Sequence, residues 1–407
     1  MITTINNEHK KVYVPNLRFP EFEGEWEKCK LGDLCNVLMC KRILASQTNT
    51  EEGVPFYKIG TIGNAPDAYI SKELFDDYKT KYNYPHKGEV MITCAGTVGK
   101  CVIYDGKDAY YQDSNIVWID NPSQCISNSF LYHLLAKVDW RKLNSTTIIR
   151  IYNDDLRNLK LSYPQIEEQQ KISRLLSFLD ERIATQNKII DKLQSLIKGL
   201  EDNLLDNPLW EKTYLRSFMQ FFSTNSLSWE QLSYEEGEIR NLHYGLIHGF
   251  QTRSINSVSL PMIKNEAIPK QYTLCQVGDV AFADASEDTG EIAKSVEFVD
   301  TIEGDTICGL HTIHGRDIKN RTVVGFKGFA FNSRYFHNQI KRLAQGTKVF
   351  SITANNLSSC HVYLPDFDTQ KAIVKLLKAY EEKLLVSKRL LEQYEKQKQY
   401  LLRQMFI

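Results

Sequence analysis

The sequence predicts a mixed α/β fold in which two similar, mainly β domains are joined by two long helices. Three observations support this prediction. The chain of 407 residues carries one framework twice, each copy ends in a long amphipathic helix, and short strand-like segments precede each helix. A repeat this long is typical of duplicated domains, because the units of solenoid proteins span roughly 20–50 residues. The expected fold is therefore α/β (α+β) with an approximate two-fold relation between its halves.

The duplication is clearest where each helix begins. The first copy reads DDLRNLKLSYPQIEEQQKISRLLSFLDERI, and the second reads NNLSSCHVYLPDFDTQKAIVKLLKAYEEKL. Pro164 corresponds to Pro365, and Gln169 corresponds to Gln370. Further upstream, WEKCKLGDL matches WEKTYLRSF and KGEVMIT matches VGDVAFA. The segments between these anchors share little, so the halves combine a common framework with different intervening sequence.

Short apolar or alternating segments, broken by Gly, Asn and Pro, predict the strands of both domains. They include GVPFYKIGTIG, GEVMITCAG and GKCVIYDG in the first half, and GEIRNLHYG, VGDVAFADA and AKSVEFVD in the second. SNSFLYHLLAKVDWRKL predicts an amphipathic helix, and a weaker helix is expected from Phe329 to Ala344. The expected segments are a first domain at 1–163, a long helix at 164–206, a second domain at 207–364 and a long helix at 365–407.

Apolar residues recur every three or four positions along both long helices, which indicates a coiled-coil seam. Each helix begins after a proline, a residue that is excluded from helix interiors. Because the second helix follows the second domain, antiparallel packing is expected. The predicted seam includes Ile172, Leu175, Leu179, Ile190, Leu193 and Ile197, and then Ile373, Leu376, Tyr380, Leu384 and Ser387. Additional leucines and isoleucines widen the stripe, either for another subunit or for the chain's own domains: Leu176, Ile189, Leu196, Leu377, Leu385 and Leu390.

Composition restricts the class of protein. Lys and Arg number 50 and Asp and Glu number 50, so the net charge of zero does not favour nucleic-acid binding, although a local basic face is compatible with it. No apolar run approaches the roughly 18 residues of a membrane span. The start, MITTINNEHKK, lacks the apolar core of a signal peptide, so a cytoplasmic location is expected. The nine cysteines form no C-x-x-C pair, which favours reduced thiols over a zinc or disulfide framework.

Several segments resemble parts of catalytic or metal-binding motifs, but each fails to meet a requirement of that motif. AGTVGKC lacks the first glycine and the final Ser or Thr of a phosphate-binding loop. Asp366 and Glu381 imitate a nuclease signature, but one helix would hold them roughly 20 Å apart, whereas a shared metal needs convergent carboxylates. His311 and His314 have no cysteine or carboxylate at ligand spacing in the sequence, which favours packing at a strand end. The chain also lacks the Pro-Pro signature of adenine methyltransferases. No catalytic, cofactor-binding or metal-binding residue is predicted.

The order W-x4-LGDL, GVPFYKIGTIG, KGEVMITCAGTVGKCVIY, DSNIVWI and YPQIEEQQKISRLLSFLDERI, repeated with different intervening sequence, resembles the specificity subunit of a Type I restriction–modification system. The resemblance covers essentially the whole chain, and its most specific part is the helix opening with Pro164, Gln169 and Ile172. The second domain departs from the pattern, because EDTGEIAK replaces the GTVGK turn. That departure leaves individual contacts in the second domain less defined.

The resemblance implies that each target-recognition domain reads one half of a bipartite site on double-stranded DNA. It implies that the helices set the spacer and dock two methyltransferase subunits, with restriction subunits joining the complex in a prokaryotic cytoplasm. S-adenosylmethionine, ATP and Mg are then expected on the partner subunits and not on this chain.

Candidate DNA contacts are basic and polar residues in loops beside the segments that differ between the halves. Arg and Lys suit guanine edges and phosphates, and Asn and Gln suit adenine. An alternative function is a two-module protein adaptor without DNA binding, which would lack the salt dependence of phosphate contacts. The candidates are Lys41, Arg42, Lys58, Asn64, Lys100, Asn144, Thr147 and Arg150 in the first domain, and Arg240, His243, Gln251, Arg253, Gln345 and Lys348 in the second.

Overall fold

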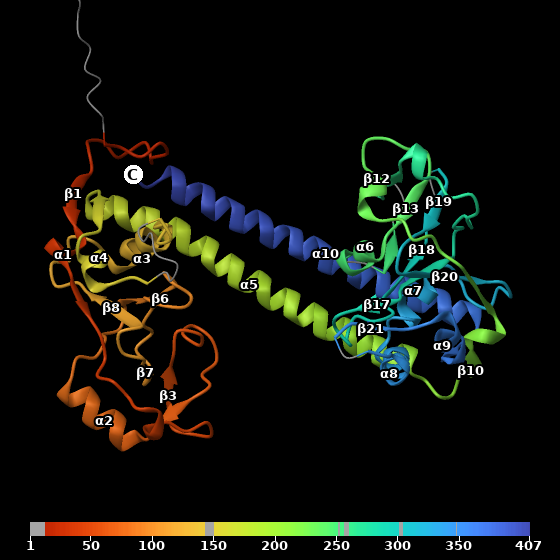
Figure 1. The fold of residues 1–407 in the computed structure, drawn as a ribbon. Helices are drawn as coiled ribbons and strands as arrows, with labels where there is room; N and C mark the ends of the chain where they lie inside the picture. Colours follow the sequence, from red (N-terminus) through yellow and green to blue (C-terminus); the bar gives the residue numbers. More distant parts are fainter. Residues whose placement is uncertain (1–12, 143–149, 251–252, 256–259, 301–303, 347) are drawn as a thin grey trace, which may run out of the picture. The chain divides into compact units, whose positions relative to one another are not determined.

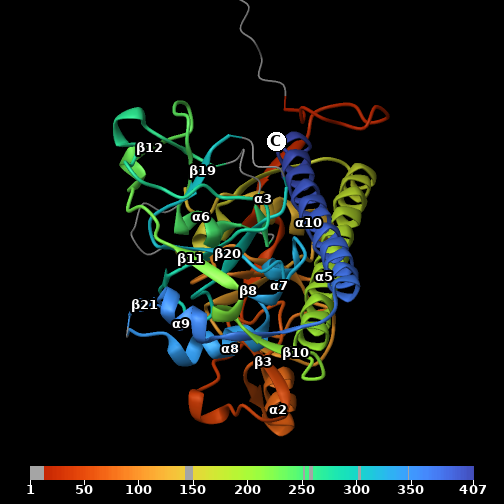
Figure 2. The same ribbon diagram turned by 90° about the vertical axis from the view of Figure 1, so that its right-hand side faces the viewer.

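The computed structural model of the chain describes residues 13–142, 150–250, 253–255, 260–300, 304–346 and 348–407 (Figure 1). The chain divides into two compact units. Unit 1 comprises Met1–Thr185 and Leu391–Ile407, and unit 2 comprises Gln186–Leu390. Both units combine helices with small sheets, as Figure 2 shows from a second direction. The predicted α/β fold class is confirmed.

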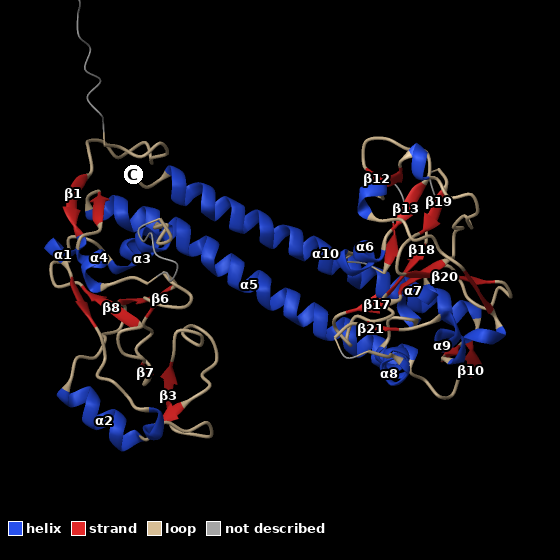
Figure 3. Cartoon of the chain, in the orientation of Figure 1, coloured by secondary structure: helices blue, strands red, loops and turns tan. Residues whose placement is uncertain are grey.

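The described strands of unit 1 form three small sheets (Figure 3). They are β1 (Glu27–Lys30), β2 (Asn36–Leu38), β3 (Val54–Tyr57), β4 (Tyr69–Ile70), β5 (Val90–Thr93), β6 (Cys101–Ile103), β7 (Tyr110–Tyr111), β8 (Ile116–Asp120) and β9 (Lys160–Tyr163). The largest sheet is antiparallel with the order β2-β8-β5-β6. In the sheet β4-β3-β7, strands β3 and β7 are parallel, and β1 pairs with β9. The shorter helices are α1 (Leu31–Leu34), α2 (Lys72–Lys81), α3 (Asn128–Lys137) and α4 (Asn153–Arg157), with a 3-10 turn η1 (Ala45–Gln47).

Unit 2 repeats this arrangement with additions. Its strands are β10 (Glu211–Tyr214), β11 (Met219–Phe222), β12 (Leu232–Ser233), β13 (Arg240–Leu242), β14 (Ser254–Ile255), β15 (Met262–Ile263), β16 (Val280–Ala283), β17 (Ala285–Ser286), β18 (Ser295–Phe298), β19 (Thr306–Cys308), β20 (Thr312–Asp317), β21 (Phe350–Ser351) and β22 (His361–Leu364). The main sheet has the order β11-β20-β16-β18-β14, which matches β2-β8-β5-β6 plus one strand. The second sheet, β12-β15-β13-β19, holds the parallel pair β13 and β19, and β10 pairs with β22.

The helices of unit 2 also follow the plan of unit 1. A short helix precedes the last strand in both units, namely α4 before β9 and α9 before β22. The described helices are α6 (Tyr244–Gly249), α7 (Phe326–Ala330), α8 (Arg334–Leu343) and α9 (Ala354–Ser359), with 3-10 turns η2 (Leu215–Ser217), η3 (Trp229–Gln231) and η5 (Asn265–Ala267).

The core of unit 1 lies between its main sheet, α3 and the long helices. The predicted amphipathic helix is α3, and it buries Phe130, Leu131 and Leu135. The ring of Phe130 lies 5.8 Å from that of Trp26 and 4.9 Å from that of Phe406, measured between centroids. The end of the chain therefore completes the core of the first unit.

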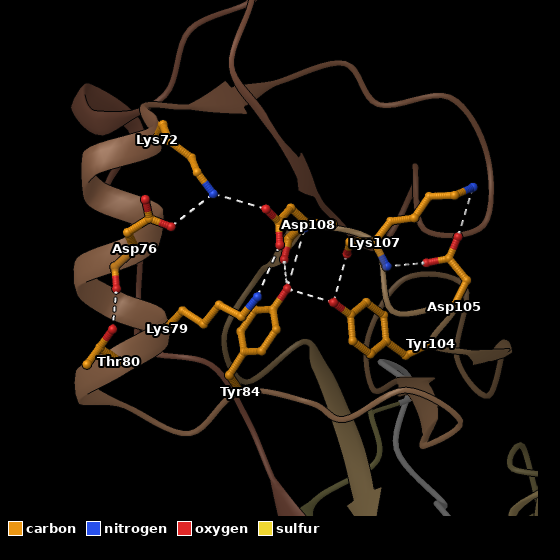
Figure 4. A network of polar contacts seen from close by, with 10 residues as sticks. Lys72, Asp76, Lys79, Thr80, Tyr84, Tyr104, Asp105, Lys107 and Asp108 are labelled. Atoms are coloured by element: carbon orange, nitrogen blue, oxygen red, sulfur yellow. Dashed lines mark hydrogen bonds and ion pairs between the residues drawn. The ribbon is translucent and has the colours of Figure 1, made fainter.

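Helix α2 is held in unit 1 by a polar network (Figure 4). The ammonium groups of Lys72 and Lys79 each lie 3.0 Å from the carboxylate of Asp108. The Tyr84 hydroxyl lies 2.9 Å from the Tyr104 hydroxyl and 2.7 Å from a backbone carbonyl oxygen, that of residue 109. Burial raises the pKa of Tyr84, so this hydroxyl stays protonated and can donate. The network fixes α2 against the segment between β6 and β7.

The two long helices are α5 (Ile166–Leu205) and α10 (Phe367–Gln404). In unit 1, Lys398 forms an ion pair with Asp180, and the Arg182 guanidinium lies over the Tyr394 ring. In unit 2, the Gln186 side-chain amide donates to the backbone carbonyl of Ser387 at 3.1 Å. Within unit 1, the later residue on α5, Arg182, contacts the earlier residue on α10, Tyr394, so the two helices run in opposite directions. The predicted antiparallel packing is confirmed.

The seam along α5 agrees with its sequence pattern. Its buried members are Ile172, Leu179, Ile190, Leu193 and Ile197. This face of α5 is therefore the apolar face that the three- and four-residue spacing predicts.

Part of the predicted stripe on the helices needs correction. Leu376 is predicted in the seam, but it is 40% exposed, while Leu377 is fully buried. Leu176 is also fully buried in the core of unit 1, so neither Leu176 nor Leu377 offers the exposed contact surface that the sequence predicts. Ile189 and Leu196 are 39% and 44% exposed. Two further members of the predicted stripe are partly buried, Leu385 and Leu390.

A buried glutamine explains the helix opening in physical terms. The Gln169 amide accepts from Ser127 N at 2.8 Å and donates to the carbonyls of Cys125 and Pro164 at 2.9 and 2.7 Å. These bonds satisfy backbone groups at the start of both α3 and α5.

Gln370 repeats the same three bonds in unit 2. It accepts from Val323 N at 2.9 Å and donates to the carbonyls of Arg321 and Pro365 at 3.1 and 3.0 Å. The Pro and Gln of the motif thus form one hydrogen-bonded unit that occurs in each half.

Among the described residues, no helix is both long and apolar enough to span a bilayer.

Candidate nucleic-acid interface

Four segments of unit 1 meet beside the C-terminal end of β5. The backbone N–H of Cys94 donates to Asn115 O at 2.7 Å, and Cys94 O accepts from Ile151 N at 2.9 Å. Gln112 N donates to Tyr57 O at 2.9 Å, which joins the ends of β3 and β7. The loops after β3, β5 and β7 and the segment before α4 therefore form one continuous surface region, here called the loop face of unit 1.

The turn after β5 positions Lys100 on this loop face. Thr93 N donates to Lys100 O at 3.0 Å, and Gly99 N donates to Thr93 O at 2.8 Å. Gly99 has a φ of 82°, and a Cβ atom there would lie 2.1 Å from Trp140 Cδ1. Only glycine fits this turn. The Lys100 ammonium then donates to the carbonyl of Ile62 at 2.6 Å, which ties two loops together.

Three other predicted contacts of unit 1, Arg42, Lys58 and Arg150, lie on or beside the loop face. The Arg42 guanidinium donates to the Asp113 carboxylate at 2.8 Å while its side chain stays 66% exposed. Lys58 lies 3.1 Å from Asp67, and Arg150 donates to a carbonyl of the loop after β7 at 3.3 Å. Lys41, Arg42 and Asn64 are exposed, while Lys58, Lys100 and Arg150 are half-buried, and Asn144 and Thr147 lie outside the described residues.

Unit 2 has the same backbone frame. Asp284 N donates to His311 O at 3.0 Å, and Asp284 O accepts from Ile352 N at 2.9 Å, as Cys94 does in unit 1. Gly309 N donates to Leu242 O at 2.9 Å, which repeats the link between parallel strands. These bonds define the loop face of unit 2 at the C-terminal end of β16.

Lys294 is a candidate that the sequence reasoning missed. Ala283 N donates to Lys294 O at 2.9 Å, and Ala293 N donates to Ala283 O at 3.0 Å, so Ala293 and Lys294 occupy the places of Gly99 and Lys100. Ala293 also has a positive φ, 57°. The sequence did carry a signal for Lys294. EDTGEIAK ends in Ala-Lys directly before a predicted strand, just as GTVGK ends in Gly-Lys before a strand in the first half. The Lys294 ammonium donates to a backbone carbonyl at 3.2 Å, as Lys100 does.

Two predicted contacts in unit 2 need correction. His243 is 3% exposed, caps α6 by accepting from Gly245 N at 3.2 Å, and lies 4.5 Å from the Trp229 ring. Burial lowers its pKa, so it is a neutral packed side chain and cannot reach a base edge as placed. The Arg253 guanidinium lies 2.6 Å from Glu201 and 2.5 Å from Glu381 on the two long helices. Arg253 is therefore a structural tether.

The remaining predictions of unit 2 concern four residues. The Arg240 guanidinium donates to Leu260 O at 3.2 Å and is half-buried. Gln345 is exposed and exchanges two backbone hydrogen bonds with Ser351, at 3.0 and 2.8 Å. Lys348 is exposed on the same turn, and Gln251 lies outside the described residues.

The second histidine of His311-x-x-His314 is buried in β20, as a packing role predicts, but it also has polar neighbours that the sequence analysis did not identify. The His314 Nε2 lies 2.7 Å from the Asp279 carboxylate, and both side chains are 1% exposed. Cys275, Cys308 and His314 place their ligand atoms within 4.8 Å of one another. The sequence could not show these neighbours, because adjacent strands bring them together. Asp366 and Glu381, the residues that resemble a nuclease signature, each have another partner. Glu381 pairs with Arg253, and Asp366 accepts a hydrogen bond from Thr369 N at 2.9 Å.

Comparisons with known proteins agree with this architecture. Residues 23–195 match the family described as Type I restriction modification DNA specificity domain. The chain is 48% identical over 169 residues to a putative type I restriction enzyme specificity subunit of Haemophilus influenzae, a match that covers 42% of this chain and 43% of that protein. The chain is related to Type I specificity subunits.

Two further comparisons, one of sequence and one of fold, extend the similarity over almost the whole chain. The putative type I restriction enzyme MjaX specificity subunit of Methanocaldococcus jannaschii is 24% identical over 403 residues, covering 93% of this chain and 92% of that protein. The crystal structure of the S subunit of a Type I restriction–modification system from M. genitalium matches with a TM-score of 0.61 and 16% identity, covering 97% of this chain and 99% of that chain. The resemblance that the motif order predicted is confirmed.

Proposed function

We propose that this chain is the DNA sequence-specificity subunit of a Type I restriction–modification complex. Residues 1–163 and 207–364 would be the target-recognition domains, each reading one half of a bipartite site. The helices at 164–206 and 365–407 would set the spacer. The chain itself would be non-catalytic, with S-adenosylmethionine, ATP and Mg on the partner subunits.

The observation that carries the proposal is the repeated loop face. Equivalent backbone hydrogen bonds hold Lys100 in unit 1 and Lys294 in unit 2, while the surrounding side chains differ. Readers of two different half-sites need this combination, because phosphate contacts fix position and base contacts specify sequence. The zero net charge is compatible with it, because the phosphate term depends on local cations.

We further propose that two methyltransferase subunits dock on the long helices. The exposed apolar residues Ile189, Leu196 and Phe178 on α5, and Val386 on α10, are 39%, 44%, 50% and 62% exposed. Ile189 and Leu196 are seven residues apart and therefore share one face of α5, and apolar side chains grouped in this way favour a subunit contact. This set replaces Leu176 and Leu377, which are buried.

The salt dependence of duplex binding tests the DNA-binding part. The chain assembled with its methyltransferase should bind a duplex that carries the methylated site, and its affinity should fall steeply with salt. The variant Lys100→Ala/Arg150→Ala should lower the log–log slope by about 0.9 for each phosphate that the variant no longer neutralises.

Lys107→Ala is the control, because Lys107 is 86% exposed, lies in the segment between β6 and β7, and pairs with Asp105 and not with a residue of the loop bonds described above. Its slope should equal that of the unmodified chain. Binding without any salt dependence, or no binding at all by the assembled complex, would instead favour the adaptor function.

A further inference from the structure

Two cysteines and a histidine converge in the interior of unit 2. Cys275 is 7% exposed, Cys308 is 2% exposed and His314 is 1% exposed. Their sulfur and ring-nitrogen atoms all lie within 4.8 Å of one another. They come from the segment before β16, the end of β19 and strand β20, so three separate parts of the unit contribute.

The strand pairing explains why the two thiols face each other. Leu274 and Ile307 form an antiparallel bridge, and Cys275 N donates to Thr306 O at 2.8 Å. Cys275 and Cys308 each follow a bridge residue by one position, and neighbouring side chains in a strand point to opposite faces. Both cysteines therefore lie on the face opposite the bridge side chains, diagonally across the pair.

The distance between the sulfurs suits a shared metal ion. The Cys275 and Cys308 Sγ atoms are 3.6 Å apart. Two thiolates bound to one tetrahedral zinc at 2.3 Å are roughly 3.8 Å apart, whereas a disulfide needs about 2.05 Å. The same tetrahedron places a histidine nitrogen roughly 3.5 Å from each sulfur, and the ligand atoms of the present cluster all lie within 4.8 Å of one another.

The surroundings of His314 resemble the outer shell of a zinc site. Its Nε2 lies 2.7 Å from Asp279 Oδ2, which leaves Nδ1 as the ring nitrogen that can coordinate. Asp279 in turn accepts from Arg316 at 2.8 and 2.7 Å and from Gln276 N at 2.8 Å. Zinc-binding histidines commonly donate their second nitrogen to a carboxylate that is itself held in place.

The local charges also balance when a divalent cation is present. Two thiolates would neutralise Zn²⁺, and Arg316 already pairs with Asp279. A buried ion needs such compensation. Apolar side chains, among them Leu242 and Phe298, belong to the same buried cluster as both cysteines and would shield the ion from bulk solvent.

We propose that Cys275, Cys308 and His314 form a zinc-binding site in unit 2, with the fourth position taken by water. Cysteine and histidine are the donors that zinc prefers. The ion would join β19 and β20 to the segment before β16. Because the turn between β19 and β20 contains His311, whose carbonyl belongs to the loop face, the ion would stabilise that face. The sequence alone predicts no such site.

Metal analysis of the full-length chain tests the proposal. The protein, produced with zinc supplied and then desalted, should contain about one zinc ion per chain. Replacement of zinc by Co²⁺ should give thiolate-to-cobalt charge-transfer absorption. Cys275→Ser/Cys308→Ser should retain at most about a tenth of the zinc. Cys360→Ser is the matched control, because Cys360 is also buried at 1% exposure, and it should keep the full amount.

Three results would overturn the site. The unmodified chain could contain no zinc and give no cobalt–thiolate absorption, a measurement that does not depend on whether any variant folds. The double variant could retain the zinc of the unmodified chain. Mass spectrometry of the unreduced protein could instead find Cys275 and Cys308 joined as a disulfide.

Discussion

In unit 1 the turn after β5 carries Gly99 and Lys100, whereas in unit 2 the turn after β16 carries Ala293 and Lys294. The same pairs of backbone hydrogen bonds close both turns. The residues around them differ: Trp140 occupies the space beside Gly99, and Lys294 forms an ion pair with Glu291 at 2.9 Å. Backbone hydrogen bonds do not depend on side-chain identity, so a duplicated backbone framework can carry two different sets of surface side chains.

The units also differ in how they hold the long helices. Unit 1 uses the ion pair of Lys398 with Asp180, and unit 2 uses Arg253 between Glu201 and Glu381. The second arrangement buries two carboxylates that face one cation. The shared elements should therefore respond alike to substitution, and these unshared elements should respond differently.

The largest effect is expected at the anchor that both units share. Gln169→Leu and Gln370→Leu each remove three hydrogen bonds and leave one buried carbonyl and two part-buried backbone groups without these partners, so each should destabilise its own unit by roughly 2–5 kcal/mol. Hydrogen exchange resolved by segment would measure the loss in each unit. Gln170→Leu, at an exposed neighbouring position, should change stability by less than about 0.5 kcal/mol. A large loss of stability in one unit and none in the other would show that Gln169 and Gln370 do not have the same structural role.

The two turns should respond asymmetrically. Gly99→Ala forces a Cβ against Trp140 at a φ of 82° and should cost roughly 3 kcal/mol or more. Ala293→Gly removes the strain of a positive φ but increases the conformational entropy of the unfolded chain. These two effects oppose each other, so the free energy of unfolding should change by less than about 1 kcal/mol. Thermal unfolding of both variants checks this. Equal losses of unfolding free energy at the two positions would contradict the prediction that only Gly99 is restricted to glycine.

A pH effect close to neutrality should belong to unit 2. Burial raises the pKa of Glu201 from 4.5 to about 7, and burial also raises that of Glu381. The folded unit then binds more protons than the unfolded chain, so the contribution of these carboxyls to stability is complete below pH 4.5 and falls as pH rises through about 7. The loss should amount to about 3 kcal/mol.

Glu201→Gln should remove most of that dependence, because the variant lacks the Glu201 carboxyl and only Glu381 still titrates. Gln194→Leu, on the same helix and lining the same cavity, is the control and should keep the dependence of the unmodified chain. Hydrogen exchange in unit 2 between pH 4.5 and 8 measures both. An unchanged slope in Glu201→Gln would contradict the assignment of the effect to this carboxyl.

Periodicity predicted the long helices and most of the α5 seam, because one apolar face repeats over many turns. It failed at the adjacent pair Leu376 and Leu377, where both residues are apolar and only the packing of unit 2 decides which is buried. The same holds for the fully buried Leu176. Sequence spacing cannot separate a core leucine from a docking leucine at neighbouring positions.

The candidate interface was predictable where a residue lies inside a shared turn. Lys100 was found because GTVGK reads as a turn, and Lys294 was missed because EDTGEIAK lacks the second glycine. Arg253 was misassigned because Glu381, its partner, lies 128 positions away. Long-range ion pairs of this kind become visible only once the fold is known.

The central claim is that each loop face reads its own half of one DNA site. Mapping of methylated bases across the genome tests it in cells that carry the methyltransferase and either Lys58→Ala/Lys100→Ala/Arg150→Ala or Lys294→Ala/Lys348→Ala. The account predicts that the first variant relaxes or loses sequence preference in one half of the site only, and the second variant in the other half only. Changes that fall in the same half, or a methylated site unchanged by both variants, would contradict it.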